Sequence, residues 1–349
     1  MWENFTAENS SSATVVNGGN RLNWVLYTGS STVGLILNML ALIIIIRGRR
    51  FNRHLRIHLL NLSIADLLSS FLLPFSARIG VVLNISYPDN LILCKIHVSV
   101  TYTIFYSSLL FNTAVALEKM MFIYFPFEML KYTKKHAIVV TVCVWIIAAL
   151  CQIGLLINSE ISINVNHKEN LACYPYGVVT EYKPKVYRLF VISSAVKHWA
   201  PSAAIAIAYG LIAIKLCCRK NIGESGCFHN RFSCRVLIML AADGLAVAVW
   251  TPYYTWLIVD SFKLPPLQPI AANKNRNIMY LFFSAAMALD CITTPIIYVI
   301  CNRDFKDDGV EIAGSIFQRL ISIKLPARRR SQEVVTSSCE VTDTTFSET

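Results

Sequence analysis

Two acidic residues, Asp66 and Asp290, interrupt long apolar stretches of the chain. A carboxylate in such a stretch is energetically costly and rarely lacks a partner. Two neighbouring carboxylates cannot both stay bare, so a cation or a shared proton must lie between them. The neutral oxygens of Asn38, Ser108 and Thr294 suit a hard cation. These residues predict a polar pocket for a cation or a proton; a protonated pair without an ion is the alternative.

Two basic residues suggest a second kind of chemistry, the recognition of an acidic group. Arg78 lies three turns beyond Asp66, and Lys197 lies one turn before Pro201. Buried cations in a membrane bundle usually face a cavity and a partner. The partner is either an acidic ligand group or an internal acid such as Asp260 or Glu181. Snorkelling toward the lipid headgroups is the third reading.

The elements that position these residues follow from hydropathy. Of the 349 residues, 55% are hydrophobic and only 15% are charged, whereas soluble domains carry about 25% charged residues. A membrane-spanning helix needs about 20 largely apolar residues. The sequence therefore predicts an all-α membrane protein, a bundle of seven transmembrane helices, over Trp24–Ile46, Ile57–Leu83, Leu93–Glu118, His136–Ile157, Tyr187–Leu216, Ser233–Phe262 and Asn277–Ile300.

Lysine and arginine set the orientation of these helices. Basic residues are concentrated in the loops after the first, third and fifth spans and after the seventh, which indicates that these segments are cytoplasmic. Residues 1–23 then form an extracellular tail with glycosylation sequons at Asn4 and Asn9. Residues 24–300 form the bundle and 301–325 an amphipathic juxtamembrane helix. Residues 326–349 form a cytoplasmic tail that is predicted to be disordered.

Several motifs fall in order on these spans. They are Asn38; Asn61-Leu-Ser-Ile-Ala-Asp66; Glu118-Lys119-Met120; Trp145; Pro201 and Tyr209; Trp250-Thr-Pro252; and Thr294-Pro295-Ile-Ile-Tyr298. From Trp24 to Lys306 the chain resembles the rhodopsin-like (class A) G-protein-coupled receptors. The family pattern departs at Lys119, where an arginine is usual, and at Thr294, where an asparagine is usual.

The resemblance assigns roles to individual residues. It implies that the ion near Asp66 is sodium. Cys94 and Cys173, both external, are expected to form a disulfide. The expected ligand-binding residues are Arg78, Thr101, Tyr102, Phe105, Lys197, Trp250, Tyr253 and Tyr254. Activation and G-protein coupling are expected to involve Glu118, Lys119, Tyr209, Trp250, Pro252, Pro295 and Tyr298.

The substitution at Lys119 has a physical consequence. Arginine makes a planar contact with two prongs, whereas lysine is a point charge and cannot copy it. A receptor that couples weakly, or a decoy receptor, is therefore an alternative reading. Thr101 stands where amine receptors carry an aspartate, and Ala288 stands where opsins carry the retinal lysine. Monoamine ligands and retinal are disfavoured.

The sequence thus predicts a plasma-membrane receptor that binds an extracellular ligand and activates heterotrimeric G proteins. A peptide ligand is favoured by the long second outer loop and the aromatic residues around Trp250. A small anionic or lipid ligand is the runner-up, and a transporter or channel is the alternative from another class. Arrestin is expected to bind the phosphorylated tail. No enzyme constellation, cofactor other than sodium, or nucleic-acid motif is apparent in the sequence.

Overall fold

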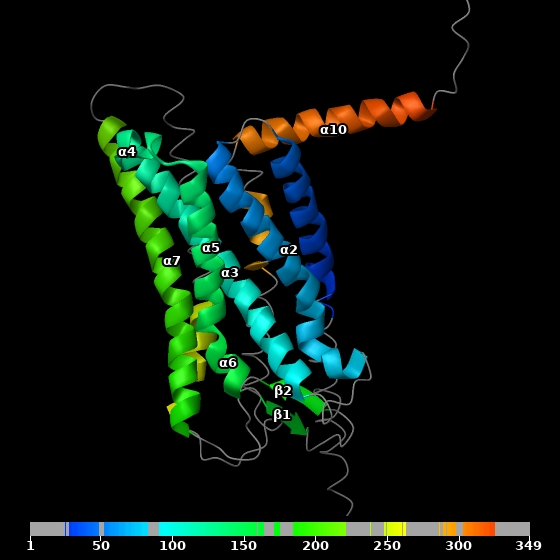
Figure 1. The fold of residues 1–349 in the computed structure, drawn as a ribbon, viewed down its shortest axis with the longest axis vertical. Helices are drawn as coiled ribbons and strands as arrows, with labels where there is room; N and C mark the ends of the chain where they lie inside the picture. Colours follow the sequence, from blue (N-terminus) through cyan, green and yellow to red (C-terminus); the bar gives the residue numbers. More distant parts are fainter. Residues whose placement is uncertain are drawn as a thin grey trace, which may run out of the picture.

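The computed structural model describes residues 25, 28–48, 52–82, 91–158, 160–163, 171–174, 184–220, 238, 248, 250–259, 261–262, 286, 289–290, 292–297 and 303–324. Predominantly helical, the described chain forms a bundle of roughly aligned helices with one helix lying across its end (Figure 1). The described helices are those expected of the predicted seven-helix membrane bundle.

The bundle begins with the helix Thr28–Arg47. It continues with α2 (Arg53–Val82), α3 (Leu91–Tyr124), the short α4 (Pro126–Leu130), α5 (Lys134–Cys151), α6 (Ile153–Asn158) and α7 (Pro184–Lys220). Residues 250–259 and 292–297 are helical within the last two predicted spans. The helix α3 extends six residues beyond the predicted end at Glu118, because apolar residues continue to Tyr124.

The break after α5 divides the predicted fourth span. The backbone N–H of Gln152 bonds to the carbonyl oxygens of Ala149 and Leu150, which closes the last turn before α6 begins. At its other end α5 starts with a capping box, in which Thr133 and His136 satisfy each other's backbone groups. The boundaries of α5 are thus set by local hydrogen bonds rather than by hydropathy.

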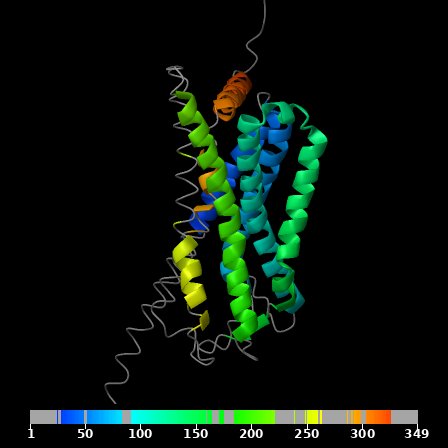
Figure 2. The ribbon, with the colours of Figure 1, turned by 90° about the vertical axis from the view of Figure 1, so that its left-hand side faces the viewer.

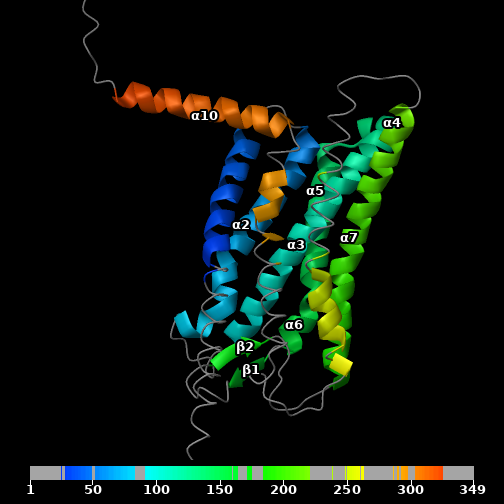
Figure 3. The same cartoon turned by 180° about the vertical axis from the view of Figure 1, so that it is seen from behind.

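A small antiparallel hairpin lies at one end of the bundle, which we call the hairpin end. Strand β1 (Glu160–Ile163) pairs with β2 (Leu171–Tyr174), with Ile161 opposite Cys173. The hairpin contacts α3, and β2 also contacts α2. At the opposite end lie α4 and α10 (Arg303–Lys324), and α10 runs nearly perpendicular to the bundle (Figures 1 and 3). We call this the α10 end.

The helix α10 begins in close contact with the first helix. A Cβ atom on Gly48 would collide with the carboxylate of Asp308 and would lie 2.6 Å from the carbonyl oxygen of Ile44. Phe305 is buried, whereas Val310 on the same helix is 67% exposed. Only a glycine at the end of the first helix leaves room for this crossing.

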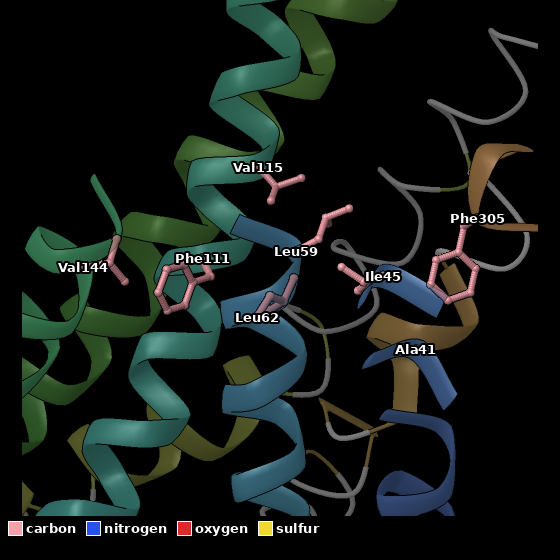
Figure 4. Close-up of a cluster of buried hydrophobic side chains, with 8 residues drawn as sticks. All are labelled: Ala41, Ile45, Leu59, Leu62, Phe111, Val115, Val144 and Phe305. Carbon is pink, nitrogen blue, oxygen red and sulfur yellow. The ribbon is translucent and has the colours of Figure 1, made fainter. Parts of the chain in front are cut away.

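The packed interior joins the first helix, α2, α3, α5 and α10. Figure 4 shows the buried side chains of this cluster: Ala41, Ile45, Leu59, Leu62, Phe111, Val115, Val144 and Phe305. The ring of Trp145 meets that of Phe111 edge-on at 5.7 Å. A second cluster joins α3 to α7 around Tyr209.

Apolar side chains also cover the outside of the helices. Val139 and Ile146 on α5 and Ile207 and Ile214 on α7 are each more than half exposed. Four described helical segments are long and apolar enough to cross a membrane, namely Thr28–Arg47, Arg53–Leu72, Lys95–Tyr124 and Lys134–Cys151. Exposed apolar surface on such segments is the pattern expected of helices that face lipid.

Candidate functional site

The two predicted carboxylates lie near each other in the middle of the bundle. Asp66 on α2 is 2% exposed, and the hydroxyl of Ser108 on α3 donates to its Oδ1 atom. Its Oδ2 atom is buried with no hydrogen-bond partner among the described residues. Asp290 and Thr294 lie within interaction range of the Asp66 carboxyl group. The structure thus brings Asp66, Ser108, Asp290 and Thr294 together.

The fifth predicted residue, Asn38, is buried on the first helix. Its side-chain amide donates to the carbonyl oxygen of Gly34, one turn earlier, at 2.9 Å. The first helix is joined to α2 near this level by Ser31, whose hydroxyl donates to the carbonyl oxygen of Ser70 at 2.5 Å. Ser70 in turn donates to the carbonyl oxygen of Asp66 at 2.8 Å.

A hydrogen bond links the carboxylates to an aromatic cluster. The indole nitrogen of Trp250 donates to Asp290 Oδ2 at 2.9 Å. Trp250 stacks on Tyr254 at 5.6 Å between ring centroids, and Tyr253 meets Tyr254 at 5.5 Å. His198 on α7 lies against both Trp250 and Tyr254, at 5.2 and 5.3 Å. We call His198, Trp250, Tyr253 and Tyr254 the aromatic cluster.

The aromatic cluster lies beside the half of α7 that is nearer the hairpin end, where residues 250–259 run alongside that helix (Figure 2). Two buried polar atoms in this region of the described chain have no hydrogen-bond partner, His198 Nε2 and, on α3, Thr101 Oγ1. Tyr102, the next residue on α3, lies within interaction range of Tyr254. Phe105 is half-buried one turn further along α3.

Of the two predicted ligand-binding cations, Lys197 and Arg78, only Lys197 has a side chain among the described residues. The ammonium of Lys197 donates to the carbonyl oxygen of Cys151 at 2.5 Å, at the last residue of α5. A cation is favourable there, because a helix carries unpaired carbonyls and partial negative charge at its C-terminus. Lys197 therefore has an internal backbone partner, and its contact with a ligand stays a prediction. The side chain of Arg78 lies outside the described residues.

At the α10 end, Glu118 contacts two histidines. Its carboxylate oxygens lie 3.3 Å from Nε2 of His54 and 3.6 Å from Nε2 of His58, both on α2. The neighbouring ammonium of Lys119 lies 5.9 Å from the centre of the Tyr209 ring on α7. The two neighbouring coupling residues thus contact different helices: Glu118 contacts α2, and Lys119 contacts α7.

Several predicted residues fall wholly or partly outside the described chain. Tyr298, Asn4 and Asn9 are among them, as are the side chains of Cys94 and Cys173. The backbones that carry the two cysteines belong to α3 and β2, which contact each other. Pro252 and Pro295 lie in helical segments, the first exposed and the second buried.

Three histidines in these sites, His54, His58 and His198, are not among the residues selected from the sequence. A histidine inside or at the edge of an apolar span is itself a signal, since such polar residues usually face the bundle interior. The sequence shows that they interrupt apolar stretches, but it does not show that two of them meet Glu118 from another helix.

Comparison with known proteins identifies the family of this chain. Residues 37–298 match the model of the 7 transmembrane receptor (rhodopsin family). The chain belongs to the rhodopsin family of seven-transmembrane receptors. G-protein coupled receptor 183 of Bos taurus is 25% identical to it over 309 residues, which cover 86% of this chain and 82% of that protein.

Membership of the family establishes the general activity. The protein is a multi-pass plasma-membrane receptor that couples an extracellular ligand to a G protein, and it is not an enzyme. The alternative of a transporter or channel is thereby set aside. In this receptor, the hydrogen bond from Trp250 to Asp290 connects the aromatic cluster directly to the carboxyl groups at mid-bundle.

Proposed function

We propose that the hairpin end faces the outside of the cell, that the aromatic cluster there binds a peptide, and that the α10 end activates the G protein. The orientation is supported by cations at the α10 end: Arg47, Arg53, Lys131, Lys134, Lys135, Lys215 and Lys306 belong to the helix termini or connections there. Such an excess is typical of cytosolic segments.

The observation that carries the peptide proposal is the presence of the hairpin and the aromatic cluster at the same end of the bundle. A two-stranded sheet has unpaired strand edges, and an extended peptide can add to such an edge through backbone hydrogen bonds. The aromatic side chains supply large apolar contact area and polar tips. His198 Nε2 and Thr101 Oγ1, both buried and unpaired among the described residues, are available to bond polar groups of an inserted peptide terminus.

A peptide library screened on cells that express the chain tests this proposal, with G-protein dissociation as the readout. A genuine peptide agonist should lose at least about tenfold in potency in Tyr254→Ala or His198→Ala, since removing a buried polar partner costs about 1–3 kcal/mol. Val142→Ala, at a half-exposed site on α5, is the matched control and should leave the potency unchanged. Activation by lipids or small anions alone, with no active peptide, would overturn the peptide proposal.

The runner-up is a ligand with an acidic group that takes Lys197 away from the Cys151 carbonyl. A charged ligand oxygen is a stronger acceptor than a backbone carbonyl. For an acidic agonist, Lys197→Met should reduce potency by at least about tenfold and leave surface expression intact. Unchanged potency would assign Lys197 to capping α5 alone.

We propose further that Asp66 and Asp290 share a sodium ion or a proton. The carboxyl groups of Asp66 and the nearby Asp290 supply negative oxygens, and Ser108 and Thr294 supply neutral ones. Oxygen donors of this kind suit a hard cation. Sodium should lower or raise agonist affinity in the wild type and have no effect in Asp66→Asn. A sodium effect that persists in this variant would exclude Asp66 as a ligand.

The external disulfide and the arrestin contact also remain proposals. A Cys94–Cys173 bond would join α3 to β2, whose backbones already contact each other, and free thiols at both positions in surface-expressed protein would contradict it. Arrestin binding to the phosphorylated tail, residues 326–349, is tested by replacing its serines and threonines with alanine. Arrestin recruitment should then be lost while G-protein activation is retained.

The surface proposed for the G protein lies on α4. Phe127 and Leu130 are 80% and 82% exposed, and Phe125 just before them is 50% exposed. An apolar patch outside the lipid-facing helices marks an interaction surface. The lysine at position 119 tests the alternative of weak coupling: Lys119→Arg should increase agonist-stimulated nucleotide exchange if the point charge limits coupling. No change would show that Lys119 is sufficient.

A further inference from the structure

Side chains from α2, α3, α5 and the α3–α5 connection meet at the α10 end. Besides its contact with Glu118, His58 places Nε2 3.4 Å from the Tyr132 hydroxyl and Nδ1 3.5 Å from the Thr141 hydroxyl. We call His54, His58, Glu118, Tyr132 and Thr141 the Glu118 cluster. His58 is its centre, because it contacts residues from three other segments.

Tyr132 extends the Glu118 cluster into the start of α5. Its ring meets His54 edge-on at 5.4 Å and stacks on His136 at 5.6 Å. His136 Nδ1 accepts the backbone N–H of Thr133 at 3.1 Å, which is the N-terminal cap of α5. The cluster thus holds the α3–α5 connection, residues 125–133, between α2 and the first turn of α5.

The hydrogen bonding of the Glu118 cluster is incomplete. The Glu118 side chain is only 9% exposed, and its Oε2 atom has no hydrogen-bond partner among the described residues. His58 Nε2 is 3.6 Å from this oxygen, just beyond bonding distance. A proton on that nitrogen would give the buried oxygen a charge-assisted partner, the stronger kind of hydrogen bond.

The titratable groups at the centre of this cluster are the imidazoles of His54 and His58, a side-chain type that gains or loses a proton in the physiological pH range, and the Glu118 carboxyl that lies against both. Burial, and then the nearby Glu118, raise the pKa of Tyr132, so its hydroxyl stays protonated. Lys119 attracts Glu118 from the next position on α3. Arg56, between the two histidines on α2, has a buried Nε without a partner among the described residues. Lys134 and Lys135, on the same turn of α5 as His136, are exposed.

We propose that His54 and His58 are positioning residues that hold the α3–α5 connection through Glu118 and Tyr132, and that this hold tightens when the imidazoles gain a proton. The inference rests on the proposed function in one respect, that the α10 end faces the cytosol. The held segment carries Phe127 and Leu130, so cytosolic protons would control how this surface is presented to the G protein.

Hydrogen exchange of residues 125–133 tests the proposal, with the purified full chain in lipid nanodiscs and without ligand or G protein. After correction for intrinsic exchange, protection in the wild type should be about tenfold higher near pH 5 than near pH 8, because this window reaches the pH at which half-buried and buried imidazoles gain a proton. The double variant His54→Gln/His58→Gln should lose this difference. Equal pH dependence in the two proteins would overturn the proposal.

Two further variants separate positioning from folding. Glu118→Gln keeps the shape of the side chain and should also abolish the pH dependence, which serves if the double variant fails to fold. His136→Gln alters a histidine that stacks on Tyr132 without an ion pair to Glu118, and it should retain the pH dependence. Loss in His136→Gln with retention in Glu118→Gln would overturn the assignment. Because no ligand is involved, failure of the peptide screen leaves this result interpretable.

Discussion

The bundle holds carboxyl groups in its interior at two levels, and they are held differently. At mid-bundle, Ser108 donates directly to Asp66, and Trp250 donates to Asp290 at 2.9 Å. At the α10 end, the carboxylate oxygens of Glu118 lie 3.3 and 3.6 Å from its two histidines, and within the described part of the chain one of these oxygens has no hydrogen-bond partner. At mid-bundle the donors are neutral and lie at bonding distance, so they hold the carboxyl groups without a change in their own charge. At the α10 end the partners of the carboxylate are themselves titratable and lie farther away, so the contact can be adjusted by a proton on either side.

The largest loss of stability is expected when the packing between the two regions is removed. Phe111 is fully buried on α3, three residues after Ser108 and seven before Glu118. Phe111→Ala should reduce the free energy of unfolding by about 3–5 kcal/mol, because the cavity loses contacts that lipid does not replace. Val142→Ala, at a half-exposed site on α5, should change it by less than about 0.5 kcal/mol. Thermal unfolding in detergent measures both, and equal effects would contradict the packing argument.

Breaking the direct bond at mid-bundle should have an intermediate effect. Trp250→Phe keeps the ring but removes the donor to Asp290, which leaves a buried carboxyl oxygen unpaired at about 1–3 kcal/mol. Trp145→Phe is the matched control, because the Trp145 indole donates at 3.2 Å to the neutral Asn61 amide. Its loss should cost about 0.5–1.5 kcal/mol. A larger loss of thermal stability in the control would show that the Asp290 bond is replaced by another partner.

The smallest effect is expected at the longer contacts. Tyr132→Phe removes a hydroxyl 3.4 Å from His58 and keeps the ring against His54. The free energy of unfolding should fall by about 0.5 kcal/mol or less, while protection of residues 125–133 decreases. The pH dependence of that protection should remain, since both imidazoles and Glu118 are still present. Its disappearance would make Tyr132, rather than the histidine–glutamate pairs, the essential link.

Much of the fold could be predicted from hydropathy, with limits that have local causes. The helix α7 runs from Pro184 to Lys220, beyond the expected bounds at both ends. The end of α5 at Cys151 depends on hydrogen bonds to Gln152, and the strands of the hairpin on pairing with each other. Apolar composition sets the length available to a helix, but capping and pairing decide where it stops.

The candidate site shows the same division. The interior positions of Asp66 and Asp290 follow from the sequence, because an acidic residue within an apolar span usually faces the bundle interior. The partner of Lys197 does not: the Cys151 carbonyl belongs to another helix, and backbone acceptors leave no mark on residue type.

The membrane class, the number of spans and the family could be predicted from the sequence, because each is encoded by hydropathy or by motifs within single helices. The contacts of Glu118 with His54 and His58, and the bond from Trp250 to Asp290, became visible only in the folded bundle. These contacts join residues on different helices, and the rotation and depth of each helix in the bundle, which set such distances, come from packing between helices.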